Sequence, residues 1–80
     1  MKEMDVYEKQ INLNPADVKD FVELASRCDF DVDVFYNRYV VDAKSILGVL
    51  ALDLTKTLTV RMYGYNAEFD SFLGKCVLAS

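Results

Sequence analysis

Two stretches of strictly alternating polarity constrain the fold of this chain more than any other feature. The stretches cover residues 30–34 and 58–63, and in each of them every second side chain is apolar. The apolar residues are Phe30, Val32, Val34, Leu58, Val60 and Met62. Such alternation indicates β-strands that bury one face and expose the other. Half-polar strands are typical of an antiparallel sheet with one wet face and with helices packed on the other.

Two further strands are expected from weaker signals. Residues 6–11 alternate imperfectly because they contain the polar run Glu8-Lys9-Gln10, so the register of this first strand stays open. A hairpin turn is expected within residues 35–38, around Asn37, since asparagine tolerates a positive φ, and the chain then returns through residues 39–41. Residues 53–57 are expected to form a loop.

The first of three expected helices covers residues 15–27. Asn14 is expected to cap it, Pro15 suits its first position because proline lacks an N–H, and Asp17 complements the helix dipole. Apolar residues then recur at intervals of three and four, which predicts one buried stripe. This stripe consists of Val18, Phe21, Val22, Ala25 and Cys28.

The second helix is short and begins after Ser45, whose hydroxyl is a preferred N-cap acceptor. Val49 and Leu52 are three residues apart and are expected to share its buried face. The third helix is expected over residues 67–78 with Asn66 as its cap. Its expected buried stripe consists of Phe69, Phe72, Leu73, Cys76 and Val77.

Composition narrows the classes of protein to which the chain can belong. Its 80 residues suit one small domain, residues 1–80, and the 52% hydrophobic and 28% charged content is ordinary for a globular protein. The net charge of −4 disfavours nucleic acid and anionic membranes as partners. There is no apolar run of about 20 residues, and residues 1–5 lack the apolar core of a signal peptide, so a cytoplasmic location is expected.

Neither metal nor cofactor chemistry is expected. Cys28 and Cys76 are far apart among apolar neighbours, which favours buried thiols over a disulfide in a reducing compartment. A zinc site is disfavoured because the chain has no histidine and no close cysteine pair. The aspartates at positions 29, 31, 33 and 42 lack the glycine and glutamate of a calcium loop.

One segment carries a family resemblance. Residues 42–52, Asp42-Ala43-Lys44-Ser45-Ile46-Leu47-Gly48-Val49-Leu50-Ala51-Leu52, resemble the regulatory-serine segment of HPr, the histidine-containing phosphocarrier of the bacterial sugar phosphotransferase system. The element order read from the sequence, β-α-β-β-α-β-α, is also that of the HPr fold. We therefore expect an α+β open-faced β-sandwich with a four-stranded antiparallel sheet and three helices on one face.

The resemblance also implies a phosphocarrier site, which this chain does not match. HPr proteins carry the phosphoryl group on a histidine at the start of the first helix, beside an arginine. Counting back from Ser45 places Asn14 at the histidine position and Ala16 at the arginine position. An amide nitrogen is not a usable nucleophile, and the stabilising cation is missing. Asp17 as an aspartyl-phosphate acceptor is disfavoured, since a capping role already explains it.

Ser45 and the residues after it form the candidate site. The resemblance implies that Ser45 is phosphorylated by a dedicated kinase, although a role as a helix cap alone would also explain it. It implies further that Ile46, Leu47 and Leu50 are partly exposed and dock protein partners, with Lys44 as a nearby cation; the alternative is core packing.

We therefore expect a non-enzymatic regulatory or adaptor protein, monomeric or weakly dimeric. Its expected partners are an HPr-type serine kinase and a transcriptional regulator. Two alternatives stay open. One is a diverged phosphocarrier of the phosphotransferase system, and the other is a structural or oligomeric module with no link to that system.

Overall fold

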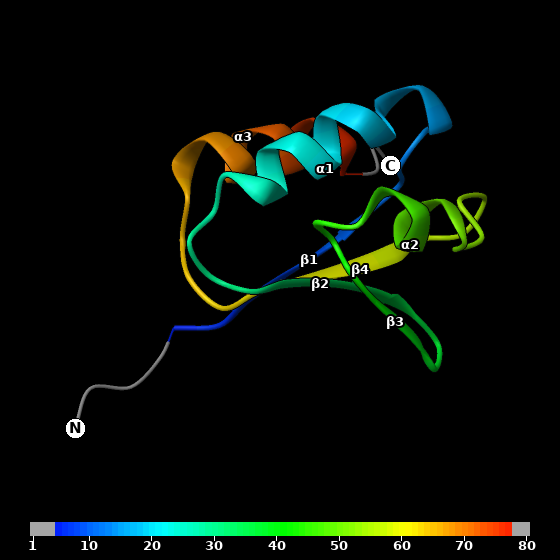
Figure 1. Cartoon of the computed structure of the whole chain (residues 1–80), viewed down its shortest axis with the longest axis horizontal. Coiled ribbons are helices and arrows are strands. Elements are labelled where there is room, and N and C mark those ends of the chain that lie inside the picture. Colours follow the sequence, from blue (N-terminus) through cyan, green and yellow to red (C-terminus); the bar gives the residue numbers. More distant parts are fainter. Residues whose placement is uncertain (1–4, 78–80) are drawn as a thin grey trace.

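The computed structural model describes residues 5–77, in which helices cover one face of a four-stranded antiparallel sheet (Figure 1). The strands are β1 (Tyr7–Ile11), β2 (Val32–Tyr36), β3 (Tyr39–Asp42) and β4 (Leu58–Met62), in the order β1-β4-β2-β3. The helices are the 3-10 turn η1 (Pro15–Asp17), α1 (Val18–Ser26), α2 (Ile46–Leu50) and α3 (Ala67–Cys76). The expected open-faced α+β fold is confirmed.

The alternating strands bury one face of the sheet beneath the helices. Their apolar side chains are at most 2% exposed at Val32, Val34, Leu58, Val60 and Met62. The open face carries polar contacts instead. Arg61 Nε donates to Glu8 Oε2 at 2.6 Å across β4 and β1, and the Arg61 guanidinium lies 5.0 Å from the centre of the Phe35 ring. The polarity pattern therefore predicted correctly which face would be wet.

The β2–β3 hairpin is tighter than expected. The sequence pattern placed the strand at residues 30–34 and the turn at 35–38, but β2 continues to Tyr36, which pairs with Tyr39. The turn is therefore only Asn37 and Arg38, and Asn37 has the expected positive φ of 56°. Phe30 lies before the strand, and its side chain packs at the edge of the core.

The first helix begins differently from the expectation. Its first turn, η1, is a 3-10 turn, and the Asn14 side chain makes no capping hydrogen bond. The Asn14 carbonyl instead accepts the N–H of Asp17 at 2.9 Å, which tightens the turn. The expected buried stripe of α1 is confirmed, since Val18, Phe21, Ala25 and Cys28 are at most 4% exposed and Val22 packs against them.

The third helix closes the core against α1 and β1. The rings of Phe21 and Phe69 lie 5.7 Å apart, and Phe69 N–H donates to Asn66 Oδ1 at 2.9 Å, which confirms the Asn66 cap. The helix ends at Cys76, so Val77 is exposed with an extended backbone and was wrongly assigned to the buried stripe. The expected end of the helix at Leu78 lies outside the described residues.

Two glycines should respond to alanine with opposite signs. A Cβ at Gly64 would lie 2.5 Å from Cδ2 of Phe30, whereas a Cβ at Gly74 in α3 would meet nothing within 4 Å. Gly64→Ala should lower the free energy of unfolding by about 1–3 kcal/mol through overpacking. Gly74→Ala should raise it by about 0.5–1 kcal/mol because alanine favours the helix. Urea unfolding of both variants tests this, and equal effects would contradict the packing assigned to Phe30.

Candidate functional site

A tight corner connects β3 to α2. Asp42 Oδ1 accepts the N–H of Lys44 at 2.9 Å, and the Asp42 carbonyl accepts the N–H of Ser45 at 3.0 Å. Ala43 is fully buried, and its N–H donates to the Val32 carbonyl at 2.9 Å. These bonds satisfy the backbone where the chain leaves the sheet. They fix the point from which α2 begins.

Ser45 caps α2, as predicted. Its backbone is extended, with φ −106° and ψ 111°, and its Oγ accepts the N–H of Gly48 at 3.2 Å. The Ser45 residue is exposed, so the hydroxyl can be reached from solvent while it acts as the cap. Capping and accessibility for modification are therefore compatible at this position.

The buried face of α2 packs against the core and against β3. Val49 is fully buried and Leu52 is 8% exposed, which confirms the expected stripe. Gly48 faces β3, since a Cβ at this position would lie 3.3 Å from Cβ of Val41. A glycine here lets the short helix lie close to the strand, and that contact holds the helix in one orientation.

The opposite face of α2 presents three apolar side chains to solvent. The exposed fractions are 43% for Ile46, 78% for Leu47 and 49% for Leu50. We call these three residues the α2 patch. They do not belong to the core, so core packing does not explain their apolar character. Their role in binding a partner stays a prediction.

Lys44 is directed toward α1. Its Nζ donates to the Cys28 carbonyl at 3.0 Å, where a cation also complements the negative end of the helix dipole. Burial raises the pKa of the Cys28 thiol, although the nearby Lys44 charge acts in the opposite direction. The thiol therefore stays neutral near pH 7. The Lys44 side chain thus connects the corner before α2 to the segment that follows α1. Its role in partner binding stays a prediction.

The two residues predicted to occupy the phosphocarrier position, Asn14 and Ala16, lie at the start of the first helical segment. Asn14 and Ala16 are both exposed, and Asn14 has an extended backbone. The segment Asn14-Pro15-Ala16-Asp17 contains an acidic residue and no cation. Burial, and then the charge of Asp17, raise the pKa of the nearby Cys76 thiol. A negative carboxylate at this end of α1 opposes the developing charge of a transferred phosphoryl group.

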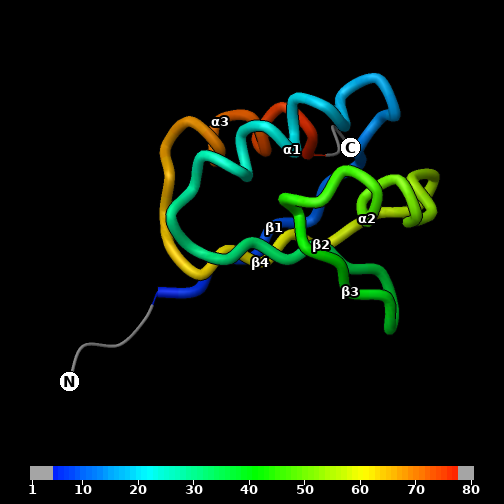
Figure 2. Tube along the Cα trace, viewed as in Figure 1, coloured from blue at the N-terminus to red at the C-terminus, as the bar shows by residue number. Residues whose placement is uncertain are grey.

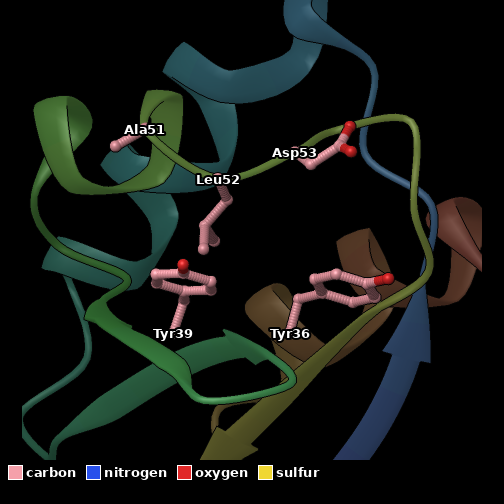
Figure 3. A pocket seen from close by; sticks show the side chains of 5 residues that line it. All are labelled: Tyr36, Tyr39, Ala51, Leu52 and Asp53. Carbon is pink, nitrogen blue, oxygen red and sulfur yellow. The ribbon is translucent and has the colours of Figure 1, made fainter.

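A pocket that the sequence did not reveal lies beyond the C-terminal end of α2. It has a volume of about 270 Å³, and Figure 3 shows the side chains that line it. These belong to Tyr36, Tyr39, Ala51, Leu52 and Asp53. Tyr36 ends β2 and Tyr39 begins β3. Their approach to α2 depends on the hairpin register, for which local polarity gives no signal.

Asp53 contributes a negative charge to this pocket. Its Oδ1 accepts the hydroxyl of Thr55 at 2.6 Å and the N–H of Thr55 at 3.0 Å. These hydrogen bonds favour the ionised carboxylate and lower the pKa of Asp53 below its ordinary value. The pocket therefore combines aromatic walls with a carboxylate that is ionised at neutral pH.

Residues 5–77 contain neither a metal-binding cluster nor a membrane-spanning helix. In that range, no group of three or more histidine, cysteine, aspartate or glutamate residues is arranged to hold a metal ion. None of the helices in the same range is long and apolar enough to cross a membrane. The α2 patch, the pocket beside it and the start of η1 are the features from which a function can be argued.

Comparison with known proteins gives one match. The family model described as PTS-HPr, the PTS HPr component phosphorylation site, matches residues 8–69. This range includes β1 from Glu8 onward, η1, α1, the β2–β3 hairpin, α2, β4 and the first residues of α3. A search of curated proteins and a search of solved structures each gave no match.

The Asp53 carboxylate gives a test of the pocket rim. Thr55→Val removes the hydroxyl donor and should raise the pKa of Asp53 toward its ordinary value, as measured by NMR titration of the carboxyl carbon. Because the folded pKa is lowered, Asp53 stabilises the fold above its unfolded pKa, and this contribution is lost as the pH falls through the folded pKa. On acidification, the free energy of unfolding should therefore fall less in Thr55→Val than in the wild type.

Thr57→Val is the matched control for this titration. The Thr57 hydroxyl donates to Asn12 Oδ1 at 3.3 Å and makes no bond to Asp53, so this variant should leave the Asp53 pKa unchanged. A similar pKa of Asp53 in the wild type and in Thr55→Val would contradict the hydrogen bonds described here.

Proposed function

This chain belongs to the HPr family, and from that premise we propose that it is a regulatory or adaptor protein that binds protein partners through the α2 patch. The observation that carries the proposal is the exposure of Ile46, Leu47 and Leu50 directly after an exposed Ser45. The family also implies an activity that is not enzymatic, since HPr proteins carry a phosphoryl group for other proteins.

Histidine phosphocarrier activity is not part of this proposal. The chain contains no histidine, so a phosphohistidine cannot form on it. Asn14 and Ala16 offer neither a nucleophile nor a cation at the start of the first helix. The family match therefore supports the fold, while the residues at the start of the first helix do not support phosphoryl transfer through a histidine.

The α2 patch has the physical character of a protein-binding surface. Leu47 is 78% exposed on a helix whose other face is anchored in the core, so a partner can desolvate it without rearranging the fold. Burial of apolar area contributes about 25 cal/mol per Å². The pocket of Tyr36, Tyr39 and Leu52 lies at the other end of α2 and gives a partner side chain a concave place to bind.

Phosphorylation of Ser45 would change this surface by adding about 1.5 to 2 negative charges directly before Ile46 and Leu47. A partner with arginine opposite the phosphate would gain charge-assisted hydrogen bonds, while a purely apolar partner would lose affinity. The Asp42 carboxylate, which accepts the N–H of Lys44, adds negative charge near the same corner. The modification would thus select between partners. We assign the kinase and a transcriptional regulator as partners on the strength of the family resemblance.

Intact mass after incubation with an HPr-type serine kinase and ATP tests the phosphosite. One phosphate should be added to the wild type and none to Ser45→Ala. Ser45→Ala should also lower the free energy of unfolding by about 1 kcal/mol through loss of the cap. An unchanged wild-type mass would mean that Ser45 acts as a helix cap and is not a phosphorylation site.

Incubation with phosphoenolpyruvate and the general phosphotransferase enzyme tests the alternative of a diverged carrier. No acid-labile phosphate should be added to the chain, and the appearance of such a phosphate would favour the carrier.

The α2 patch is tested separately with Leu47→Glu. This variant should lower kcat/KM for phosphorylation by the same kinase by about tenfold or more, because a buried apolar contact is replaced by a charge. Val6→Glu is the matched control, since Val6 is also an exposed apolar residue, at 49%, and lies before β1. Equal loss in both variants would point to a general charge effect and against the α2 patch.

A further inference from the structure

We propose that the free edge of β3 pairs in antiparallel fashion with β3 of a second copy of this chain, which joins two sheets into one. This proposal is independent of the α2 patch. Figure 2 shows the β2–β3 hairpin, with β3 on the side of β2 away from β4. β3 is the last strand in the order β1-β4-β2-β3. Its outer edge therefore has no strand beside it within residues 5–77.

The hydrogen bonds at the end of β3 show which backbone groups face outward. Ala43 N–H donates to the Val32 carbonyl, and alternate residues of an antiparallel strand share one orientation. The backbone N–H and C=O groups of residues 39 and 41 therefore face β2. The backbone N–H and C=O groups of Val40 and Asp42 face outward, away from β2. The Asp42 carbonyl already accepts the N–H of Ser45. The groups left for a new strand are the N–H and C=O of Val40 and the N–H of Asp42.

The two edge strands, β1 and β3, differ in how well their side chains prevent pairing with a strand of another chain. On β1, the side chains of Glu8 and Lys9 form ion pairs with Arg61 and Asp70 at 2.6 and 2.7 Å. Charged residues on an edge strand discourage pairing with another chain. β3 has the sequence Tyr39-Val40-Val41-Asp42, without lysine or proline, and Val40 is 60% exposed. β3 has a single charged residue, Asp42, whereas β1 has two, and β3 is thus the less protected edge.

A second copy fits this edge because the strand is complementary to itself. In the antiparallel register that places Val40 opposite Val40, Arg38 of one copy lies opposite Asp42 of the other. Tyr39 then lies opposite Val41, an aromatic and β-branched pair that favours sheet formation. Arg38 makes no ion pair within residues 5–77. A shift that centres the pairing on Val41 would instead oppose Arg38 to Lys44, two like charges.

The same register matches the free backbone groups. The Val40 N–H of each copy meets the Val40 carbonyl of the other, which gives two hydrogen bonds at the twofold axis. Pairing over five residues buries little area, so the dimer should be weak and dependent on concentration. The complementary charges and the hydrogen-bond pattern both select a second copy as the occupant of this edge.

Sedimentation velocity over a wide range of concentrations tests the proposal. The wild type should show a concentration-dependent monomer–dimer equilibrium. Val40→Lys places two like charges across the twofold axis and should raise the dissociation constant by about tenfold or more. Gln10→Lys, on the exposed face of the other edge strand, is the matched control and should dimerise like the wild type. A wild type that stays monomeric at the highest concentration would overturn the proposal.

A charge exchange tests the register. Arg38→Asp should weaken dimerisation because it opposes two aspartates, and the double variant Arg38→Asp, Asp42→Arg should restore it. Failure of the double variant to recover, with a native circular dichroism spectrum, would exclude this register. A dimer lost in Leu47→Glu but kept in Val40→Lys would assign self-association to the α2 patch and overturn the β3 pairing. Val40→Lys changes neither the hydrogen bonds of the corner before α2 nor the α2 patch, so this proposal and the proposed function can fail separately.

Discussion

Burial of the central strand β4 is the constraint on which the rest of the structure depends. β4 pairs with β1 on one side and β2 on the other, and its inward residues Leu58, Val60 and Met62 are shielded by the helices. A four-stranded sheet of this size needs one covered face to be stable in water. The contact between Phe21 and Phe69 brings α1 and α3 together over that face. β3 and α2 are then left at the edge of the sheet, where the candidate site lies.

The short helix α2 packs against the rest of the protein through one face only, so its opposite face is exposed to solvent. Its orientation rests on the Ser45 cap, on the approach of Gly48 to Val41, and on the buried residues Val49 and Leu52. A helix of five residues would not be stable alone. Because tertiary contacts order it, the α2 patch is presented in one conformation, which lowers the entropic cost of binding a partner.

The start of the first helix shows that an HPr-type fold does not require the phosphocarrier chemistry. η1 (Pro15–Asp17) is closed by the backbone hydrogen bond from the Asp17 N–H to the Asn14 carbonyl, and the Asn14 side chain takes no part in it. The carboxylate of Asp17 near Cys76 makes this region negative rather than positive. Because this turn is closed through the backbone, the fold does not depend on a capping side chain at position 14.

The local sequence determined the elements, and long-range packing determined the surfaces. The alternation in β2 and β4, the turn at Asn37 and the caps Ser45 and Asn66 were predictable because each depends on side-chain period or on hydrogen bonds between near neighbours. The segment 42–52 also carried enough unusual residues to indicate the family.

Other features were decided only by the tertiary structure. Segments distant in the sequence create the contact of Lys44 with Cys28, the packing of Phe30 at Gly64 and the pocket beside α2. At the end of α3, the Cys76 carbonyl likewise accepts the N–H of Asn12, a residue far away in the sequence. A periodic pattern shows which apolar residues share one face of a helix. Whether the fold covers that face depends on segments that are distant in the sequence.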